Sequence, residues 1–313
     1  PAHIQERDMQ TAAPTLMNQA REQARRFGLR RFWKRLSPPA NLRQRDTSPE
    51  AIQADAEYGL NTGLSFYNHL RASGLDPVGL DTLEIGPGTG FGGAVVLTAF
   101  GARDAVADRW LSSWQDDYHR PYYRRLADLL AAAHPEADIR PIISLAEQGC
   151  YETGAIDLIS SQAEILDSAT ERRFDAIFSN AVLEHVLDID TSLKALCRLT
   201  RPGGHGFHQV DFRDHRNFSR PLDHLLYAKQ AFERLSQRVH MEYGSQRRPK
   251  EYSQAFETAG FTIEDYSPNE VADTAYLDDL MAQLTRSLRS PHKNTSREEL
   301  HDLSGLFVVR RVV

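Results

Sequence analysis

The sequence predicts an α/β protein built on a largely parallel sheet. From Leu80 onward, short apolar segments alternate with longer segments of helical character, which is the pattern of βαβ units. A glycine-rich turn, Gly86-Pro87-Gly88-Thr89-Gly90, follows the first apolar segment and opens the next helix. The chain has 313 residues, 41% of them hydrophobic and 26% charged, which suffices to bury the core of such a domain together with an appendage.

Two helices are predicted ahead of the sheet. Residues 1 to about 37 have helical character and end at a proline pair. A second helix is predicted to begin after Ser48, which can cap it, and to end near Gly74. We therefore assign residues 1–75 to a helical extension or lid, and residues 76–313 to the main domain.

The first of these helices carries a basic arm over residues 21–36. Seven arginines and lysines stand there against a single acid, Glu22, with aromatic side chains among them. Such an arm fits an anionic membrane surface or RNA phosphates, but a helix that packs its aromatics on the domain has the same composition. The net charge of −6 argues against nucleic acid as a partner.

Composition also predicts the cellular setting. The two cysteines, Cys150 and Cys197, are too few for a disulfide framework, and their spacing is not that of metal ligands. There is no run of 18 apolar residues and no signal-peptide pattern, which favours the reducing cytoplasm. No metal is expected, because the histidines and acids near residue 211 match no standard metal signature.

The remaining elements follow from the alternation of apolar and helical segments. Strands are expected at residues 80–85, 103–107, 156–160, 174–179, 204–211, 261–266 and 306–310. Helices are expected at residues 91–100, 109–133, 188–200, 225–237 and 250–259. Two insertions interrupt this series: an irregular one near 134–155, with a candidate short strand at 139–143, and a polar, helix-rich one near 267–303.

The turn after the first strand predicts a ligand site. Glycines at alternate positions let a ligand lie against the main chain, and the N-terminus of the next helix faces the same crevice. Glu84, two residues before the turn, would repel a pyrophosphate but suits a ligand that carries an ammonium group. A dinucleotide site is the alternative, since residues 88–93 satisfy Gly-x-Gly-x-x-Gly. That fingerprint begins too late, however, because the turn already starts at Gly86.

An acid at the end of the second strand supports a nucleoside ligand. Asp108 lies about 20 residues after the glycine turn, where a carboxylate can accept hydrogen bonds from ribose hydroxyls. Because NAD sites share this feature, Asp108 does not distinguish the two ligands. The alternative role for Asp108 is to cap the helix that follows.

Four blocks in sequence carry a family resemblance over residues 80–211. They are Glu84-Ile85-Gly86-Pro87-Gly88-Thr89-Gly90, Phe174-Asp175-Ala176-Ile177-Phe178-Ser179-Asn180, Leu183-Glu184-His185-Val186 and Pro202-Gly203-Gly204. Their order resembles class I S-adenosylmethionine (SAM) methyltransferases of the ubiquinone-biosynthesis and type 11 kind. The resemblance implies a Rossmann-like methyltransferase sheet with an antiparallel last strand, SAM as cofactor and S-adenosylhomocysteine as product.

The same resemblance implies which residues bind the cofactor. They are Glu84, Gly86, Pro87, Gly88 and Gly90 at the methionine moiety, Asp108 at the ribose, Gln162 and Ala163 at the adenine, and Asn180 at the methionine end. Gln162 departs from the Asp usual in the family. Its carbonyl still accepts from an adenine amino group, but without a charge.

Methyl transfer mainly requires alignment, and a base helps when the acceptor is a hydroxyl. The candidate bases are His185 and the pair Asp211 and His215; the alternatives are a structural histidine and a solvated charged loop. The expected reaction is O-methylation of a small-molecule or glycan hydroxyl. The alternatives are an RNA methyltransferase that uses the basic arm and a SAM-binding partner protein without catalysis. Arg247, Arg248 and Lys250 either hold an anionic part of the acceptor or form an exposed loop.

Overall fold

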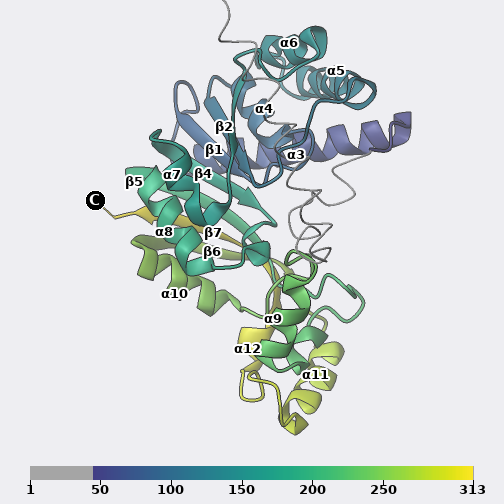
Figure 1. Cartoon of the computed structure of the whole chain (residues 1–313), viewed down its shortest axis with the longest axis vertical. Coiled ribbons are helices and arrows are strands. Elements are labelled where there is room, and N and C mark those ends of the chain that lie inside the picture. Colours follow the sequence, from purple (N-terminus) through teal and green to yellow (C-terminus); the bar gives the residue numbers. More distant parts are fainter. Residues whose placement is uncertain (1–44, 313) are drawn as a thin grey trace, which may run out of the picture.

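A computed structural model describes residues 45–312, so the basic arm and the helix predicted before residue 37 lie outside it. The described chain forms one seven-stranded sheet with helices on both faces (Figure 1). Its strands lie in the order β3-β2-β1-β4-β5-β7-β6. They are β1 (Asp81–Ile85), β2 (Arg103–Asp108), β3 (Ile156–Ser160), β4 (Phe174–Asn180), β5 (Thr200–Asp211), β6 (Phe261–Val271) and β7 (Asp302–Arg311).

The strand directions confirm the predicted sheet. The pairs from β3 through β5 are all parallel, whereas β7 is antiparallel to both of its neighbours, β5 and β6. The order reverses between β1 and β4, and open α/β sheets bind ligands at the carboxyl ends of strands beside such a switch point. The glycine turn follows β1, so the topology places it there.

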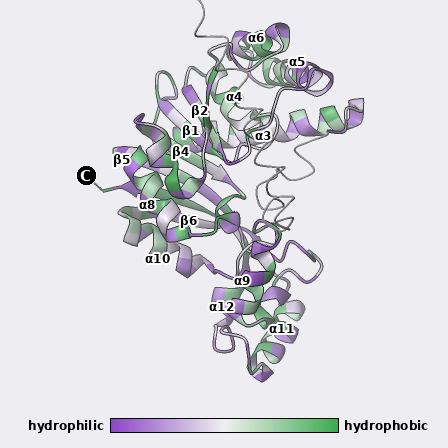
Figure 2. Ribbon diagram, viewed as in Figure 1, coloured by the Kyte–Doolittle hydropathy of each residue, from purple (hydrophilic) through white to green (hydrophobic). Residues whose placement is uncertain are grey.

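Most of the helices of residues 45–312 cover the two faces of the sheet, and α9 (Lys229–Gln237), α11 (Thr274–Arg286) and α12 (Arg297–His301) lie beyond one end of it (Figure 1). The other helices are α3 (Pro49–Ala72), α4 (Gly92–Ala99), α5 (Asp116–Ala133), α6 (Arg140–Gln148), α7 (Leu166–Ala169), α8 (Ile189–Leu199) and α10 (Pro249–Ala259). Apolar residues of α3 to α6 are buried together on one face, and those of α8 and α10 on the other. Figure 2 shows the apolar colouring of the inner strands. Among the helices of residues 45–312, none has the length and apolar character that a membrane span requires.

Two predicted elements are wrong in detail. The candidate strand at 139–143 belongs to α6, whose Ile142 and Leu145 are fully buried and lie on one face of the helix, against α5. Gly149 ends this helix in a left-handed conformation (φ 72°). The helix expected from residue 109 begins only at Asp116.

Helix α3 lies directly on α4. Ser48 caps it as predicted, its Oγ accepting from the Ala51 N–H at 3.3 Å. The two helices meet at glycines, because a Cβ on Gly92 would come within 2.5 Å of the Gly59 Cα. This close approach holds α3 above the glycine turn.

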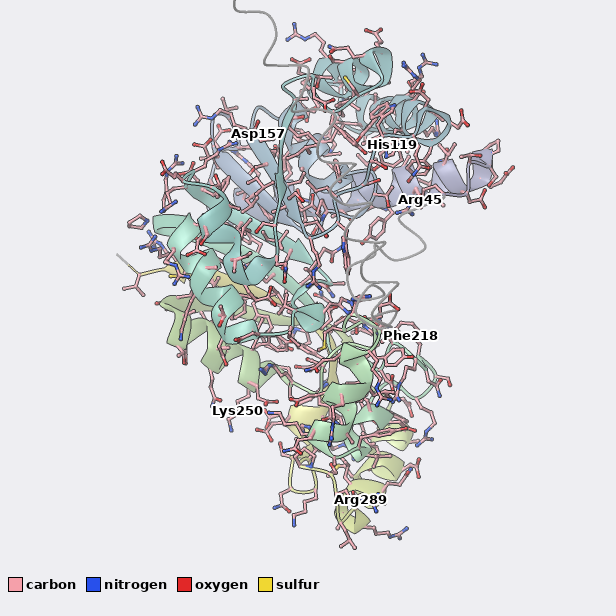
Figure 3. All side chains as sticks on the ribbon, viewed as in Figure 1. Arg45, His119, Asp157, Phe218, Lys250 and Arg289 are labelled. Atoms are coloured by element: carbon pink, nitrogen blue, oxygen red, sulfur yellow. The ribbon has the colours of Figure 1, made fainter. Side chains whose placement is uncertain are left out.

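A helical unit projects from one end of the sheet. It consists of residues 212–248, which follow β5, and residues 272–301, which link β6 to β7. Leucines from both segments share one apolar cluster. The unit lies at the lower end of Figure 1, and Figure 3 places Phe218 and Arg289 within it and Arg45 beside α3.

Candidate active site

Two adjoining cavities lie at the carboxyl ends of β1, β2 and β4. The larger, of about 470 Å³, is lined from β2 by Asp108 and from the loop after β3 by Gln162 and Ala163. The smaller, of about 210 Å³, is lined by Glu84 and Asn180 and by residues of α3 and α5. Both cavities reach the glycine turn. Every predicted cofactor-binding residue therefore lines one of the two.

The three glycines of the turn have different environments. Gly86 and Gly88 are left-handed, with φ of 64° and 71°. A Cβ at Gly86 would come within 2.5 Å of Val182, and one at Gly90 within 2.5 Å of Tyr122. A Cβ at Gly88 would meet nothing within 4 Å. Gly86 and Gly90 are thus required for packing, whereas Gly88 faces the open cavity.

Glu84 is buried beneath the turn. Its carboxylate accepts from the Ala94 N–H at 2.9 Å, at the start of α4. Burial disfavours the charged form and raises the pKa of Glu84 to about 7, although the Ala94 hydrogen bond opposes this. A ligand ammonium in the smaller cavity would supply the positive charge that favours the ionised form.

Asp108 holds the loop after β2 by one hydrogen bond, and its carboxylate can accept others from a ligand. Its Oδ1 accepts from the Trp110 N–H at 2.7 Å, and no side chain of residues 45–312 hydrogen-bonds to it. Burial raises the pKa of Asp108. The alternative of a helix cap is wrong, because α5 begins only at Asp116 and its N-cap is Gln115. The carboxylate lines the larger cavity, as a ribose-binding acid would.

Gln162 differs from the expected adenine contact in one respect. The Arg109 guanidinium donates to its Oε1 at 3.0 Å. A carbonyl oxygen has a second lone pair, so an adenine amino group would share this acceptor with Arg109.

Helix α3 lines the smaller cavity, where the predicted lid would lie, but sequence reasoning did not predict its contacts. The Asn180 amide donates to the Tyr58 hydroxyl at 2.9 Å, and the Tyr118 hydroxyl donates to Asp55 at 2.6 Å. Tyr58 and Asn180 lie 122 residues apart in the chain. The available signal was the expectation that the N-terminal helices form a lid.

The predicted catalytic residues come together on the turn after β4 and the loop after β5. The rings of His185 and His215 lie 4.9 Å apart, and His215 Nε2 lies 3.5 Å from Asp211 Oδ2. The Nδ1 of His185 lies 2.7 Å from the carbonyl oxygen of Met241. Burial lowers the pKa of His185, since it disfavours the imidazolium. His185 lines the larger cofactor cavity.

Two further groups complete this cluster. Burial alone would raise the pKa of Asp211, but His215 and Arg213 outweigh it and hold the pKa below its usual range. Arg213 also pairs with Glu270 at 2.6 Å. Glu184, which sequence reasoning did not assign, is only 1% exposed and lies beside His185. Its place in the Leu183-Glu184-His185-Val186 block was the available signal.

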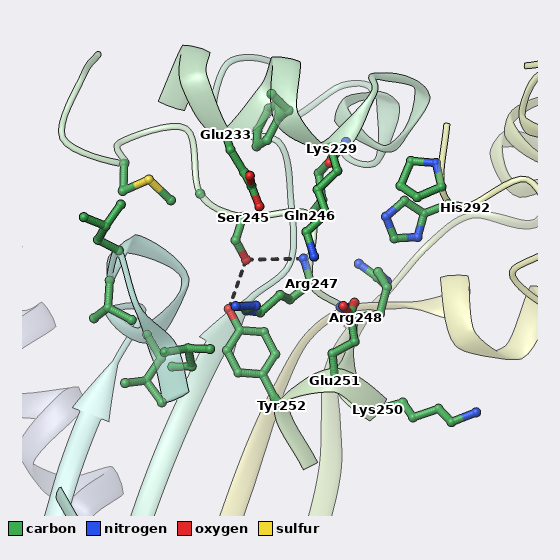
Figure 4. A pocket seen from close by; sticks show the side chains of 18 of the residues that line it. Lys229, Glu233, Ser245, Gln246, Arg247, Arg248, Lys250, Glu251, Tyr252 and His292 are labelled. Atoms are coloured by element: carbon green, nitrogen blue, oxygen red, sulfur yellow. Dashed lines mark hydrogen bonds between the residues drawn. The ribbon is translucent and has the colours of Figure 1, made fainter. Parts of the chain in front are cut away.

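A third cavity of about 670 Å³ adjoins the larger cofactor cavity and shares Val186, Leu187, Gln237 and Met241 with it. Figure 4 shows its polar lining, including Ser245, whose hydroxyl lies 3.1 Å from that of Tyr252. It lies between the sheet and the helical unit. We name it the acceptor cavity, after the role that we propose for it.

The three basic residues of the segment 247–250 differ in their partners and in whether they can bind a ligand in the acceptor cavity. Arg248 is 3% exposed and donates to backbone carbonyls, among them Phe212 and Leu300, so its role is structural. Lys250 pairs with Glu299 at 3.3 Å. Arg247 forms no ion pair with residues 45–312, and its side chain lines the cavity. Of the three predicted anion-binding residues, only Arg247 is available for an acceptor.

Comparisons with known proteins gave one family model and several similar solved structures. The model of the methyltransferase domain family matches residues 56–266. No curated protein matches the sequence. Similar solved structures include a putative sarcosine dimethylglycine methyltransferase from Galdieria sulphuraria, with 13% identity, TM-score 0.43 and coverage of 88% of this chain and 92% of that one. A SAM-dependent methyltransferase from Mesorhizobium loti has 16% identity and TM-score 0.44, with coverage of 78% and 97%.

A phosphoethanolamine N-methyltransferase from Haemonchus contortus has 14% identity and TM-score 0.44. The match covers 81% of this chain and 53% of that one. Because the family model spans more than half of the sequence, the chain belongs to the methyltransferase domain family, as a class I SAM-dependent methyltransferase. Its cofactor is SAM.

The buried Glu84 predicts a pH-dependent affinity for S-adenosylhomocysteine. The free protein holds Glu84 protonated below its pKa of about 7. If the ligand ammonium pairs with the ionised carboxylate, binding releases a proton. We then expect affinity to rise about fivefold between pH ~6 and pH ~7, and to level off above. Isothermal titration at several pH values measures this change.

Glu84→Gln is the matched control for this prediction. The amide keeps the size of the side chain but has no ionised form. The variant should therefore bind S-adenosylhomocysteine more weakly than the wild type, with an affinity that does not change over this pH range. An equal pH dependence in the wild type and in Glu84→Gln would show that another group titrates.

Proposed function

We propose that this methyltransferase transfers the methyl group of SAM to a hydroxyl of a polar small molecule or a sugar. The observation that supports the proposal is the position of the cluster of His185, His215 and Asp211. His185 lines the larger cofactor cavity, and its neighbours Leu183 and Val186 line the acceptor cavity. A hydroxyl that approaches the methyl group from the acceptor cavity would pass this cluster.

The chemistry requires the enzyme to align the acceptor and to remove one proton. SAM supplies a methyl group on a positively charged sulfur. The acceptor oxygen forms a bond to this methyl carbon, the carbon–sulfur bond breaks, and its electron pair stays on sulfur. The hydroxyl proton leaves by way of the cluster, as expected for a site of general-base chemistry.

The lining of the acceptor cavity favours a polar acceptor. Arg247 and Lys229 supply cationic groups, while Glu233 and Glu251 supply acceptors for hydroxyl protons. Both signs of charge face the same cavity (Figure 4). A molecule with several hydroxyls and one anionic group would match this lining.

The test is to identify the atom that receives the methyl group. The full-length protein is incubated with SAM labelled with ¹³C at the methyl group and a panel of sugars, phenols, amines and carbon acids. We expect a product signal at the chemical shift of a methyl ether. Product formed only with an amine or a carbon acid would refute O-methylation.

A further inference from the structure

We infer that Glu184, His185 and His215 form a binding site for a divalent first-row transition metal ion beside the cofactor cavity. Glu184 and His185 lie on the one-turn helix Leu183–His185 after β4, and His215 lies on the loop after β5. One ligand atom from each of these residues lies within 4.8 Å of the other two. A single cation placed between them reaches an oxygen and two imidazole nitrogens.

The carboxylate of Glu184 is the strongest argument for a cation. Its side chain is 1% exposed, and no side chain of residues 45–312 hydrogen-bonds to either oxygen; the backbone N–H groups of Glu184 and Asp211 are the donors near it. A buried carboxylate without a charged partner costs folding free energy, unless a proton or a positive charge compensates it. A metal ion in this place would supply that charge.

His185 is oriented as metal-binding histidines are. Its Nδ1 lies 2.7 Å from the Met241 carbonyl oxygen, which can only accept, so Nδ1 carries the proton. The lone pair is therefore on Nε2, which lies 3.9 Å from Glu184 Oε1. A backbone carbonyl that fixes the tautomer in this way is the common second partner of a ligand histidine.

His215 supplies the third ligand from the other side. Its Nε2 is buried and has no hydrogen-bond partner in the described part of the chain, although Asp211 Oδ2 lies 3.5 Å away. The nearby cation, Arg213, is paired with Asp211 at 2.7 Å and with Glu270 at 2.6 Å. Asp211 and Glu270 thus neutralise the charge of Arg213, and the Glu184 carboxylate can bind the metal.

The donor set determines the class of metal. Two imidazoles and one carboxylate suit Mn²⁺, Fe²⁺, Co²⁺ or Zn²⁺ better than Mg²⁺ or Ca²⁺, which prefer oxygen ligands. Three protein ligands leave coordination positions for water or an acceptor oxygen. As far as catalysis is concerned, the inference rests on the proposed O-methylation. A bound cation would make a coordinated hydroxyl more acidic, its proton would pass through the cluster to water, and its oxygen would attack the methyl group. With the cation bound, His185 and His215 would serve as ligands and not as bases.

The test measures metal binding without acceptor or SAM, so its outcome is independent of the proposed function. The full-length protein is treated with a chelator and titrated with Zn²⁺ alone by isothermal titration calorimetry. We expect one equivalent to bind, with affinity reduced about tenfold or more in Glu184→Gln and in His215→Gln. Co²⁺ in place of Zn²⁺ should give visible absorption bands that His185→Gln changes.

His134→Gln is the matched control, because His134 forms a surface pair with Glu136 at 2.9 Å, far along the chain from the cluster. It should bind Zn²⁺ as the wild type does. Circular dichroism confirms that each variant is folded, and Glu184→Gln retains the size of the side chain. Absence of binding to the wild type, or equal binding by Glu184→Gln, would overturn the inference.

Discussion

Gly88→Val is expected to abolish binding of SAM and of S-adenosylhomocysteine while the protein remains folded. A Cβ at Gly88 would meet no protein atom within 4 Å, so the added methyl groups project into the cavity. The smaller cofactor cavity holds only about 210 Å³, and the methionine moiety needs this space. Isothermal titration measures the binding, and thermal unfolding measures the stability.

Gly79→Val is the control for backbone strain. Gly79 has φ of 75°, close to the 71° of Gly88, and it too has open space around its Cα. A β-branched residue in this conformation costs about 1–3 kcal/mol at either position. We expect both variants to lose similar stability and only Gly88→Val to lose the ligand. Unfolding of Gly88→Val alone would assign Gly88 a structural role.

Asp108→Ala is expected to weaken S-adenosylhomocysteine binding by about 1–3 kcal/mol, or about 5–150-fold. The substitution leaves the ribose hydroxyls without their acceptor. Asp108→Asn keeps the oxygen that accepts from the Trp110 N–H. A comparison of the two variants therefore separates the loss of the ribose contact from a change in the loop. Titration calorimetry gives the affinities.

The control for Asp108 is Asp157→Ala on the neighbouring strand β3. Asp157 pairs with Arg172 on the surface, and it does not line the cofactor cavities (Figure 3). The Asp157→Ala variant should bind S-adenosylhomocysteine with the affinity of the wild type. NAD should not bind any of these proteins. Tight NAD binding would restore the dinucleotide alternative.

The parallel strands and the glycine turn could be predicted because their signals are local. A short apolar run followed by Gly86 and Gly88 specifies a strand and a turn whatever the rest of the chain does. The helix α6 was missed because the adjacent Ile142 and Ile143 have strand propensity. Burial of Ile142 and Leu145 against α5 outweighs that propensity.

The parts of the site that escaped prediction depend on distant contacts. The metal-binding role proposed for Glu184 depends on the loop after β5, which brings His215 to it. Similarly, Arg248 looks from its charged neighbours like part of an exposed or anion-binding loop. Its guanidinium instead binds carbonyls of residues about 50 positions later, which local sequence does not encode.

The helical unit divides the enzyme into parts that can change separately. The segments 212–248 and 272–301 leave from the sheet and return to it, and their leucines pack mainly on one another. The cofactor cavities are lined mainly by β1, β2, β4, α3, α5 and the loops after the strands, and the unit contributes Gln237, His240 and Met241 to the larger one. If the acceptor binds in the proposed cavity, substitutions in the unit away from Gln237, His240 and Met241 can alter which acceptor enters and leave the cofactor-lining residues unchanged. Over evolutionary time, acceptor preference in such an enzyme can diversify faster than its use of SAM.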